Sequence, residues 1–136
     1  MIQDVAPRDA WQALSSDPRA QLCDVRTDAE WSFVGLPDLT PVGKDVLLLP
    51  WQIYPAMAVN ADFVADLRNA GLAAEDPIYF ICRSGARSRA AAMAAREAGF
   101  LHVYNVADGF EGGLDAEGHR GRLAGWKAEG LPWRQR

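Results

Sequence analysis

One cysteine lies where a strand-like stretch meets a helix-like stretch. Cys82 follows the apolar run 78–81, typical of a buried strand, and precedes the alanine-rich run 90–95, typical of a helix. A cysteine in such a turn lies near the helix N-terminus, where the helix dipole and free amide groups favour thiolate over thiol. Arg83 and Arg87 add positive charge nearby. The sequence therefore predicts a nucleophilic sulfur or a bound anion at this turn.

A cysteine inside a strand is often only a small buried hydrophobic residue. Cys82 differs, because polar residues and a glycine follow it directly. Gly85 suits a tight loop whose backbone curls inward. We therefore interpret Cys82 as the catalytic residue. The residues expected to bind the substrate around it are Arg83, Ser84, Gly85, Ala86, Arg87 and Ser88.

The polar side chains of this loop each have a binding role and a structural role open to them. Arg87 is expected to attract an anionic donor, and its alternative is an ion pair with a neighbouring acid. For Arg83 the two roles are equally open. Ser84 and Ser88 could donate hydrogen bonds to the sulfur or to the donor, and Ser88 could equally cap the following helix.

Length and composition restrict the class of protein. A chain of 136 residues suits one domain spanning 1–136, and its net charge of −4 argues against nucleic-acid binding. No stretch approaches the roughly 20 apolar residues of a membrane span, and the N-terminus shows no secretory signal. Two cysteines do not make a disulfide framework. We expect a cytoplasmic protein with neither nucleic-acid nor membrane partners.

Strand-like and helix-like stretches alternate along the chain. This alternation predicts a parallel sheet with helices on both faces, and ligands of such sheets bind at the carboxyl ends of the strands. The predicted strands cover residues 2–5, 21–25, 46–49, 78–81 and 102–106.

Three helix boundaries can be predicted from local residue patterns. Thr27 and Glu30 have capping-box spacing, so Glu30 is expected to have a structural role. Asn60 is expected to be the N-cap of a helix that ends at Gly71. Residues 123–129 are expected to form a short helix before Gly130.

The end of the second predicted strand carries two charged residues and the second cysteine. Asp24 and Arg26 could shape a pocket, but we prefer an ion pair that ties this loop to its neighbours. Cys23 is interpreted as a core residue, since buried cysteines are usually inert. A disulfide between Cys23 and Cys82 is the less favoured alternative.

Several segments match the motifs of one enzyme family. They are residues 82–88, residues 24–26 followed by Glu30 and Trp31, residues 105–110, residues 125–127 and residues 131–133. On these residues the chain resembles the rhodanese family of sulfurtransferases, and the match covers most of its length. The loop 82–88 is the most specific part of the resemblance.

The resemblance implies both a fold and a reaction. It implies a three-layer α/β/α sandwich whose five parallel strands lie in the order 1-5-4-2-3. Cys82 would take a sulfane sulfur from a small-molecule donor such as thiosulfate, hold it as a persulfide, and pass it to cyanide or a thiol. Neither a cofactor nor a metal is implied, and no protein partner is identified.

Residues 35–57 are the least family-like part of the chain. Members of the family usually carry a histidine-containing, glycine-rich run after the Glu-Trp pair, whereas this chain has no histidine there and an additional segment. The apolar residues 51–57 could form a wall of the active site or cover the edge of the sheet.

Other functions need patterns that the chain lacks or matches only in part. Cysteine-dependent phosphatases and arsenate reductases need five residues between cysteine and arginine, but that position is Ser88 here. A thiol protease needs a histidine base, and neither His102 nor His119 lies in a suitable pattern. The scattered cysteines and histidines do not have metal-ligand spacing. A non-catalytic binding module remains the main alternative, although such modules usually lose the cysteine.

Overall fold

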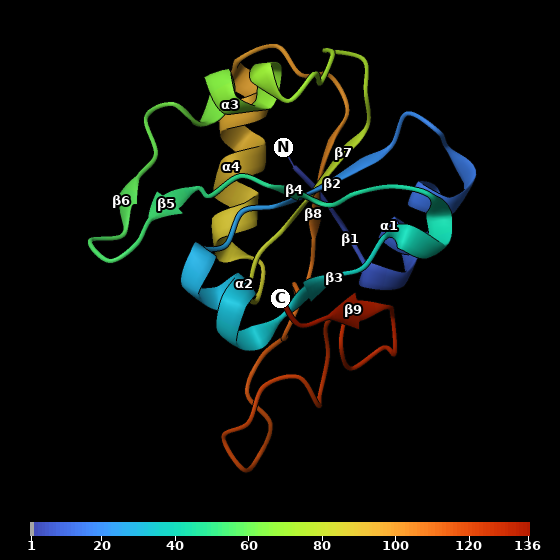
Figure 1. Ribbon diagram of the computed structural model, residues 1–136, viewed down its shortest axis with the longest axis vertical. Coiled ribbons are helices and arrows are strands. Elements are labelled where there is room, and N and C mark those ends of the chain that lie inside the picture. Colours follow the sequence, from blue (N-terminus) through green and yellow to red (C-terminus); the bar gives the residue numbers. More distant parts are fainter. Residues whose placement is uncertain (1) are drawn as a thin grey trace.

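The central element is a five-stranded parallel sheet. The computed structural model describes residues 2–136. The strands of this sheet are β1 (Gln3–Val5), β2 (Gln21–Asp24), β4 (Leu47–Leu48), β7 (Ile78–Ile81) and β8 (Val103–Val106). They lie in the order β1-β8-β7-β2-β4, and each neighbouring pair is parallel (Figure 1). Counted along the chain this is the order 1-5-4-2-3, so the predicted topology is confirmed.

Helices and short strands surround this sheet. The helices are α1 (Pro7–Ser16), α2 (Asp28–Val34), α3 (Phe63–Asn69) and α4 (Ala86–Glu97), with a 3-10 turn η1 at Thr40–Val42. Two small antiparallel pairs join β3 (Leu36–Pro37) to β9 (Trp133–Arg134), and β5 (Gln52–Ile53) to β6 (Ala58–Val59).

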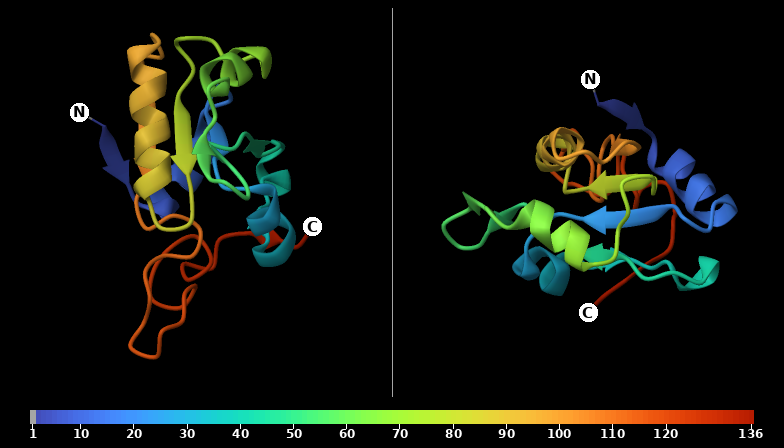
Figure 2. Two further views of the ribbon diagram at one scale, coloured as in Figure 1. Left: turned by 90° about the vertical axis from the view of Figure 1, so that its left-hand side faces the viewer. Right: turned by 90° about the horizontal axis from the view of Figure 1, so that it is seen from above.

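Each face of the sheet has its own apolar core. Side chains of α3 and α4 pack on one face, where Phe63 and Ala92 belong to the same buried cluster as Phe80. Side chains of α1 pack on the other face, where Leu14 lies in the same cluster as Trp126. Seen along the sheet, α3 and α4 lie on one side and α1 lies on the other (Figure 2, right). The predicted three-layer sandwich is therefore confirmed.

The parallel register brings the ends of β2 and β7 to one edge of the sheet. Asp24 is the register partner of Ile81, so β2 and β7 end side by side and Cys82 comes just beyond this edge. The segment after β8 crosses the same edge and projects beyond it (Figure 2, left). This edge holds the candidate site.

Helix α2 begins with the predicted capping box. Thr27 Oγ1 accepts a hydrogen bond from Glu30 N at 3.3 Å, and Glu30 Oε1 accepts one from Thr27 N at 3.2 Å. These two bonds satisfy amide groups that have no partner within the helix. They also orient the Glu30 carboxylate at the start of α2.

Helix α3 begins later than predicted. Its N-cap is Asp62, whose side chain makes no capping bond, rather than Asn60. Asn60 instead accepts a hydrogen bond from Asp62 N at 3.0 Å through its side chain, which is a turn that precedes the helix. The Asn60 amide group also donates to Pro50 O at 3.1 Å, so Asn60 joins the helix to the end of the sheet.

The helix predicted over 123–129 is wrong, because this segment forms turns. Trp126 N donates to Gly109 O at 2.9 Å and Lys127 N donates to Phe110 O at 3.2 Å. These amides are therefore bonded to the turn after β8 rather than to a helix of their own. Gly125 has a φ of 101°, a left-handed conformation that interrupts a helix.

The atypical segment 35–57 has two parts with different environments. Trp51 packs edge-on against Phe63, with ring centroids 5.2 Å apart, and so covers the core beside the sheet. The β5–β6 hairpin extends away from the sheet (Figure 1), and Ile53 and Tyr54 are exposed on it. A hollow of about 500 Å³, lined by Ile53, Tyr54 and residues of α2, lies between the hairpin and α2.

Within residues 2–136, no helix is both long enough and apolar enough to cross a lipid bilayer.

Candidate active site

The loop 82–88 joins β7 to α4 and bends its backbone around the Cys82 sulfur. Gly85 has a φ of 115°, which side-chain-bearing residues rarely adopt, and it is the N-cap of α4. Its amide donates to Cys82 Sγ at 3.1 Å. Ser88 Oγ, in the first turn of α4, lies 3.2 Å from the same sulfur. The predicted strand-loop-helix turn thus places an amide and a hydroxyl group within hydrogen-bond distance of the Cys82 sulfur.

The turn after β8 is hydrogen-bonded to the backbone of this loop. Phe110 N donates to Cys82 O at 2.8 Å, while Glu111 N and Gly112 N donate to Arg83 O at 3.0 and 3.1 Å. With its carbonyls bonded in this way, the loop is fixed by a segment more than twenty residues further along the chain. Cys82 itself is only 1% exposed.

Ser88 connects the sulfur to the edge strand of the sheet. Its hydroxyl lies 2.5 Å from Asn105 Oδ1, and Asn105 Nδ2 donates to Asp4 Oδ1 at 2.9 Å. Ser88 and Asn105 are buried. The sequence singled out Asn105 only as part of a matching segment and assigned no role to Asp4, because the strand register that joins them is not visible in the sequence.

Arg87 forms an ion pair with the capping glutamate of α2. Its two terminal nitrogens lie 2.6 and 2.9 Å from the carboxylate oxygens of Glu30. Burial by itself raises the pKa of Glu30, but the hydrogen bonds and charge of Arg87 bring that pKa below its ordinary value. The hydrogen bond to Glu30 is also the main reason that the pKa of Arg87 is raised. This ion pair is the alternative that the sequence left open for Arg87, and its role toward an anionic donor stays a prediction.

Replacing Glu30 by glutamine is expected to lower the free energy of unfolding by about 1–2 kcal/mol at neutral pH, because Arg87 loses a charged partner. Glutamine keeps the capping box, since its oxygen can still accept from Thr27 N. Because the folded pKa of Glu30 is depressed, the wild-type advantage is complete above its unfolded value of 4.5 and is lost as pH falls through the lower folded value. Urea unfolding at several pH values measures this advantage.

The matched control is Glu97→Gln, which changes an exposed glutamate at the end of α4. We expect this variant to change the free energy of unfolding by less than about 0.5 kcal/mol at any pH. A difference between wild type and Glu30→Gln that stays constant from neutral pH down to about pH 3 would contradict the ion pair.

The other residues of the loop face outward. The residues Arg83, Ser84 and Ala86 are exposed. Arg120 Nη1 donates to Gly112 O at 2.8 Å, and Gly112 N in turn bonds Arg83 O. Arg120 is therefore bonded to Gly112, the residue whose amide bonds the loop. Arg122 is exposed. The pKa of Asp115 is lowered mainly by the hydrogen bond from His119 N, and the charge of Arg122 is a minor cause. Arg83 and Arg120 bring two guanidinium groups to this edge.

Asp24 and Arg26 form the expected ion pair. Both side chains are fully buried, and Arg26 Nη2 lies 2.7 Å from Asp24 Oδ2. Arg26 Nη2 also donates to Gly35 O at 2.8 Å, and the guanidinium lies 4.3 Å from the centroid of the Phe110 ring. Within residues 2–136, Arg26 Nη1 has no hydrogen-bond partner. The pair joins β2 to the chain after α2 and to the turn after β8.

Cys23 is a core residue, as predicted. It is fully buried and belongs to the same apolar cluster as Cys82, and both cysteines are free. Burial raises the pKa of Cys23 well above its ordinary value, and the charge of Asp24 adds to this effect. Its thiolate form is therefore strongly disfavoured.

The two histidines lie at other places. His102 O accepts from Ile78 N at 2.8 Å, at the amino end of β7, whereas Cys82 follows its carboxyl end. His119 lies in the exposed loop, where its amide donates to Asp115 Oδ1 at 2.8 Å. Neither position supplies a base for Cys82, which agrees with the prediction.

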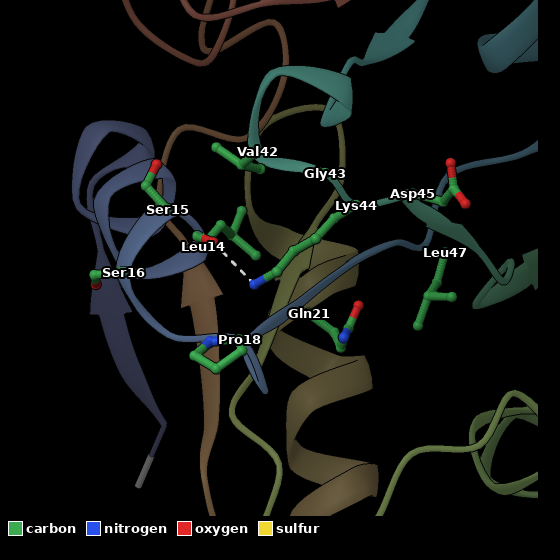
Figure 3. A pocket seen from close by; sticks show the side chains of 10 residues that line it. All are labelled: Leu14, Ser15, Ser16, Pro18, Gln21, Val42, Gly43, Lys44, Asp45 and Leu47. Atoms are coloured by element: carbon green, nitrogen blue, oxygen red, sulfur yellow. Dashed lines mark hydrogen bonds between the residues drawn. The ribbon is translucent and has the colours of Figure 1, made fainter.

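A separate hollow of about 610 Å³ lies between the end of α1 and residues 42–47 (Figure 3). Lys44 extends across it and donates from Nζ to Leu14 O, Asp17 O and Ala20 O at 2.8, 2.6 and 2.7 Å. Burial lowers the pKa of this ammonium group. All three N–H groups of the Lys44 ammonium are used in these bonds. Lys44 therefore stabilises the C-terminal end of α1 and the turn after it, rather than binding a ligand.

Comparisons with known proteins agree with this geometry. The profile of a family described as "Rhodanese-like domain" matches residues 6–116. The crystal structure of Rv0390 from M. tuberculosis is 50% identical, has a TM-score of 0.89, and covers 98% of both chains. An uncharacterised protein of Rickettsia conorii is 37% identical over 97% of both chains. A thiosulfate sulfurtransferase of Actinobacillus pleuropneumoniae is 25% identical over 95% of this chain and 90% of its own.

Proposed function

The chain belongs to the rhodanese-like domain family, and from this premise we propose that it is a sulfurtransferase. It moves a sulfane sulfur from a donor such as thiosulfate to a thiophilic acceptor, either cyanide or a thiol, through a persulfide on Cys82. The family includes sulfurtransferases, and one relative at 25% identity carries that name. The donor and the acceptor are part of this proposal.

The observation that carries the proposal is the environment of the Cys82 sulfur. The Gly85 amide at 3.1 Å and the Ser88 hydroxyl at 3.2 Å converge on Sγ at the N-terminus of α4. The Gly85 amide stabilises negative charge on sulfur, as does the positive end of the helix dipole. The pKa of Arg87 is raised mainly by its hydrogen bond to Glu30 and, to a smaller extent, by the charge of Cys82. The positive charge of Arg87 therefore also acts on this sulfur.

The reaction takes place in two displacements. The Cys82 thiolate, whose proton has gone to solvent, attacks the outer sulfur of thiosulfate. The sulfur–sulfur bond of the donor breaks, and sulfite leaves with its electron pair. The acceptor then attacks the outer sulfur of the persulfide, and Cys82 leaves as thiolate. Dividing the transfer into two steps is ordinary covalent catalysis, and it needs no separate base.

The loop backbone and its charges have separate roles in this reaction. The outer sulfur of the persulfide would be held by the amides of residues 83–87. Exposed Arg83, which forms no ion pair within residues 2–136, would attract the anionic donor, while Arg87 keeps the loop in place through Glu30. The proposed setting is the cytoplasm, a reducing compartment in which both cysteines stay free.

Intact-mass measurement after incubation with thiosulfate tests the proposal. We expect the mass to increase by one sulfur atom, and cyanide to remove that sulfur. The control variant Cys82→Ser, which is nearly isosteric, should gain nothing. Cys23→Ala should still gain the sulfur, because Cys23 lies in the core away from the loop amides.

Two other outcomes would point to other functions. A folded protein that gains no sulfur from thiosulfate or from other sulfane-sulfur donors would favour a binding module without turnover. Hydrolysis of a generic aryl phosphate that is lost in Cys82→Ser would favour a cysteine-dependent phosphatase. The second result is not expected, since the loop has one residue fewer between cysteine and arginine than phosphatases need.

A further inference from the structure

A chain of hydrogen bonds runs from the Cys82 sulfur to an exposed carboxylate at the edge of the sheet. It passes from Sγ to Ser88 Oγ (3.2 Å), to Asn105 Oδ1 (2.5 Å), and from Asn105 Nδ2 to Asp4 Oδ1 (2.9 Å). Asp4 and Asn105 are register partners on β1 and β8, so their side chains lie on the same face of the sheet. Asp4 is 47% exposed and pairs with Arg89 of α4.

The chemistry of each group sets the direction of these bonds. A carboxylate only accepts, so the Asn105 amide must turn its NH₂ group toward Asp4. Its oxygen therefore faces Ser88, and this oxygen also only accepts. Ser88 has a single hydroxyl hydrogen, and two acceptors other than the sulfur lie within its reach, Asn105 Oδ1 at 2.5 Å and Gly85 O at 3.2 Å. The shorter distance assigns the hydrogen to Asn105, and both acceptors draw it away from Sγ. Ser88 consequently presents a lone pair, and not a hydrogen, to the Cys82 sulfur.

This direction favours one protonation state of the sulfur. A thiol can donate its hydrogen to the Ser88 lone pair. A thiolate has no hydrogen to donate and gains a bond from Ser88 only if the hydroxyl hydrogen leaves Asn105 and turns toward Sγ. Until it does, the Gly85 amide at 3.1 Å is the hydrogen-bond donor that the thiolate keeps within residues 2–136.

We propose that Asp4 and Asn105 are positioning residues that hold the Ser88 hydroxyl hydrogen away from Cys82 and thereby set the pH at which this sulfur becomes nucleophilic. The inference rests on the proposed function, because it concerns the same sulfur. It adds that the reactivity of Cys82 depends on Asp4, an exposed residue more than seventy positions away in the sequence.

Asp4→Asn tests the proposal without changing a buried group. An amide at position 4 can both donate and accept, so the Asn105 amide is free to turn over. The Ser88 hydrogen then leaves Asn105 and has two acceptors, the sulfur and Gly85 O, each 3.2 Å from Ser88 Oγ, of which the charged thiolate is the stronger. We expect the pH profile of Cys82 alkylation by iodoacetamide to shift to lower pH. The rate near neutral pH should rise about threefold to tenfold, which is the size of the typical net contribution of one hydrogen bond. Mass analysis of the peptide that contains Cys82 separates this reaction from any at Cys23.

A simple charge effect must be separated from positioning, since Asp4→Asn also removes a negative charge. The same substitution in a Ser88→Ala background does this. If Asp4 acts through the Ser88 hydroxyl, its effect disappears in that background. A shift that persists there comes from charge alone and overturns the proposal, as does an unchanged profile in Asp4→Asn itself.

Arg89→Gln is the matched control for the lost ion pair. It breaks the pair with Asp4 but keeps the carboxylate, and so keeps the direction of the Asn105 amide. We expect no shift to lower pH in this variant, and such a shift would overturn the proposal. Equal thermal unfolding midpoints of the variants would show that the loop remains folded.

Other charged groups around the loop stay the same in these comparisons. They come from the loop itself, from α2, from the end of β2 and from the turn after β8, and they are Arg83, Arg87, Glu30, Asp24, Arg26 and Asp108. Alkylation reads the sulfur directly and needs no sulfur donor. A protein that alkylates as expected but gains no sulfur from thiosulfate would contradict the proposed function and leave the positioning inference intact.

Discussion

Replacing Asp24 by asparagine is expected to lower the free energy of unfolding by about 3–5 kcal/mol, because it leaves the Arg26 charge buried without a counter-ion. Both side chains have no exposed surface, and Arg26 bonds both oxygens of the Asp24 carboxylate at 2.7–3.2 Å. Arg26 already has one terminal nitrogen without a partner within residues 2–136, so little remains to replace the lost bonds. The midpoint and slope of urea unfolding measure the effect.

The exposed ion pair between Arg136 and Asp28 supplies the matched control. Asp28 is 76% exposed, so Asp28→Asn makes the same chemical change in water. Its expected cost is below about 1 kcal/mol, including the loss of an acidic residue from the first turn of α2. Equal losses of unfolding free energy in the two variants would mean that the buried ion pair stabilises the fold no more than the exposed one.

Replacing Gly109 by alanine is expected to slow the transfer of sulfur to Cys82 by about tenfold to a hundredfold, since small displacements of reacting groups have effects of this size. Gly109 has a φ of 60°, and an added Cβ would lie 2.6 Å from the carbonyl carbon and oxygen of Arg83 and would also clash with Cys82 O. These are backbone atoms of the loop 82–88, so this loop must move to relieve the clash. The rate of sulfur gain from thiosulfate measures the effect, and the rate of iodoacetamide alkylation provides a second measure.

Gly43→Ala separates this clash from simple backbone strain. Gly43 has a φ of 71°, close to that of Gly109, but no atom lies within 4 Å of an added Cβ. Both variants are expected to lose about 1–2 kcal/mol of stability from the left-handed conformation. Only Gly109→Ala should also alter the reactions of Cys82. Unchanged reactions in that variant would mean that the turn after β8 does not position the loop.

Features that depend on neighbouring residues in the chain could be predicted from the sequence. The run 78–81, Gly85 and the alanine-rich helix lie within twenty residues, and their patterns identify the turn that holds Cys82. The capping box of Thr27 and Glu30 is likewise a local pattern. The sheet order was implied by the resemblance of the loop and other segments to a known family, and the structure confirms it.

Local patterns were insufficient where distant segments compete for the same backbone groups. Residues 123–129 have the composition of a short helix, yet the amides of Trp126 and Lys127 bond the turn at 109–110. Helix α3 starts after Asn60 because the Asn60 side chain is engaged with Pro50 and with the turn before the helix. In both cases a tertiary contact outweighed a weak local preference.

By itself, the sequence identified the cysteine that we propose carries the sulfur chemistry and the kind of turn that presents it, because these depend on residue types a few positions apart. Only the tertiary structure decided which partners surround that turn. Glu30 reaches Arg87 across 57 residues, and Asp4 reaches Asn105 across 101 residues. Such pairs arise from strand register and helix packing, which bring together residues whose separation along the chain contains no signal of their contact.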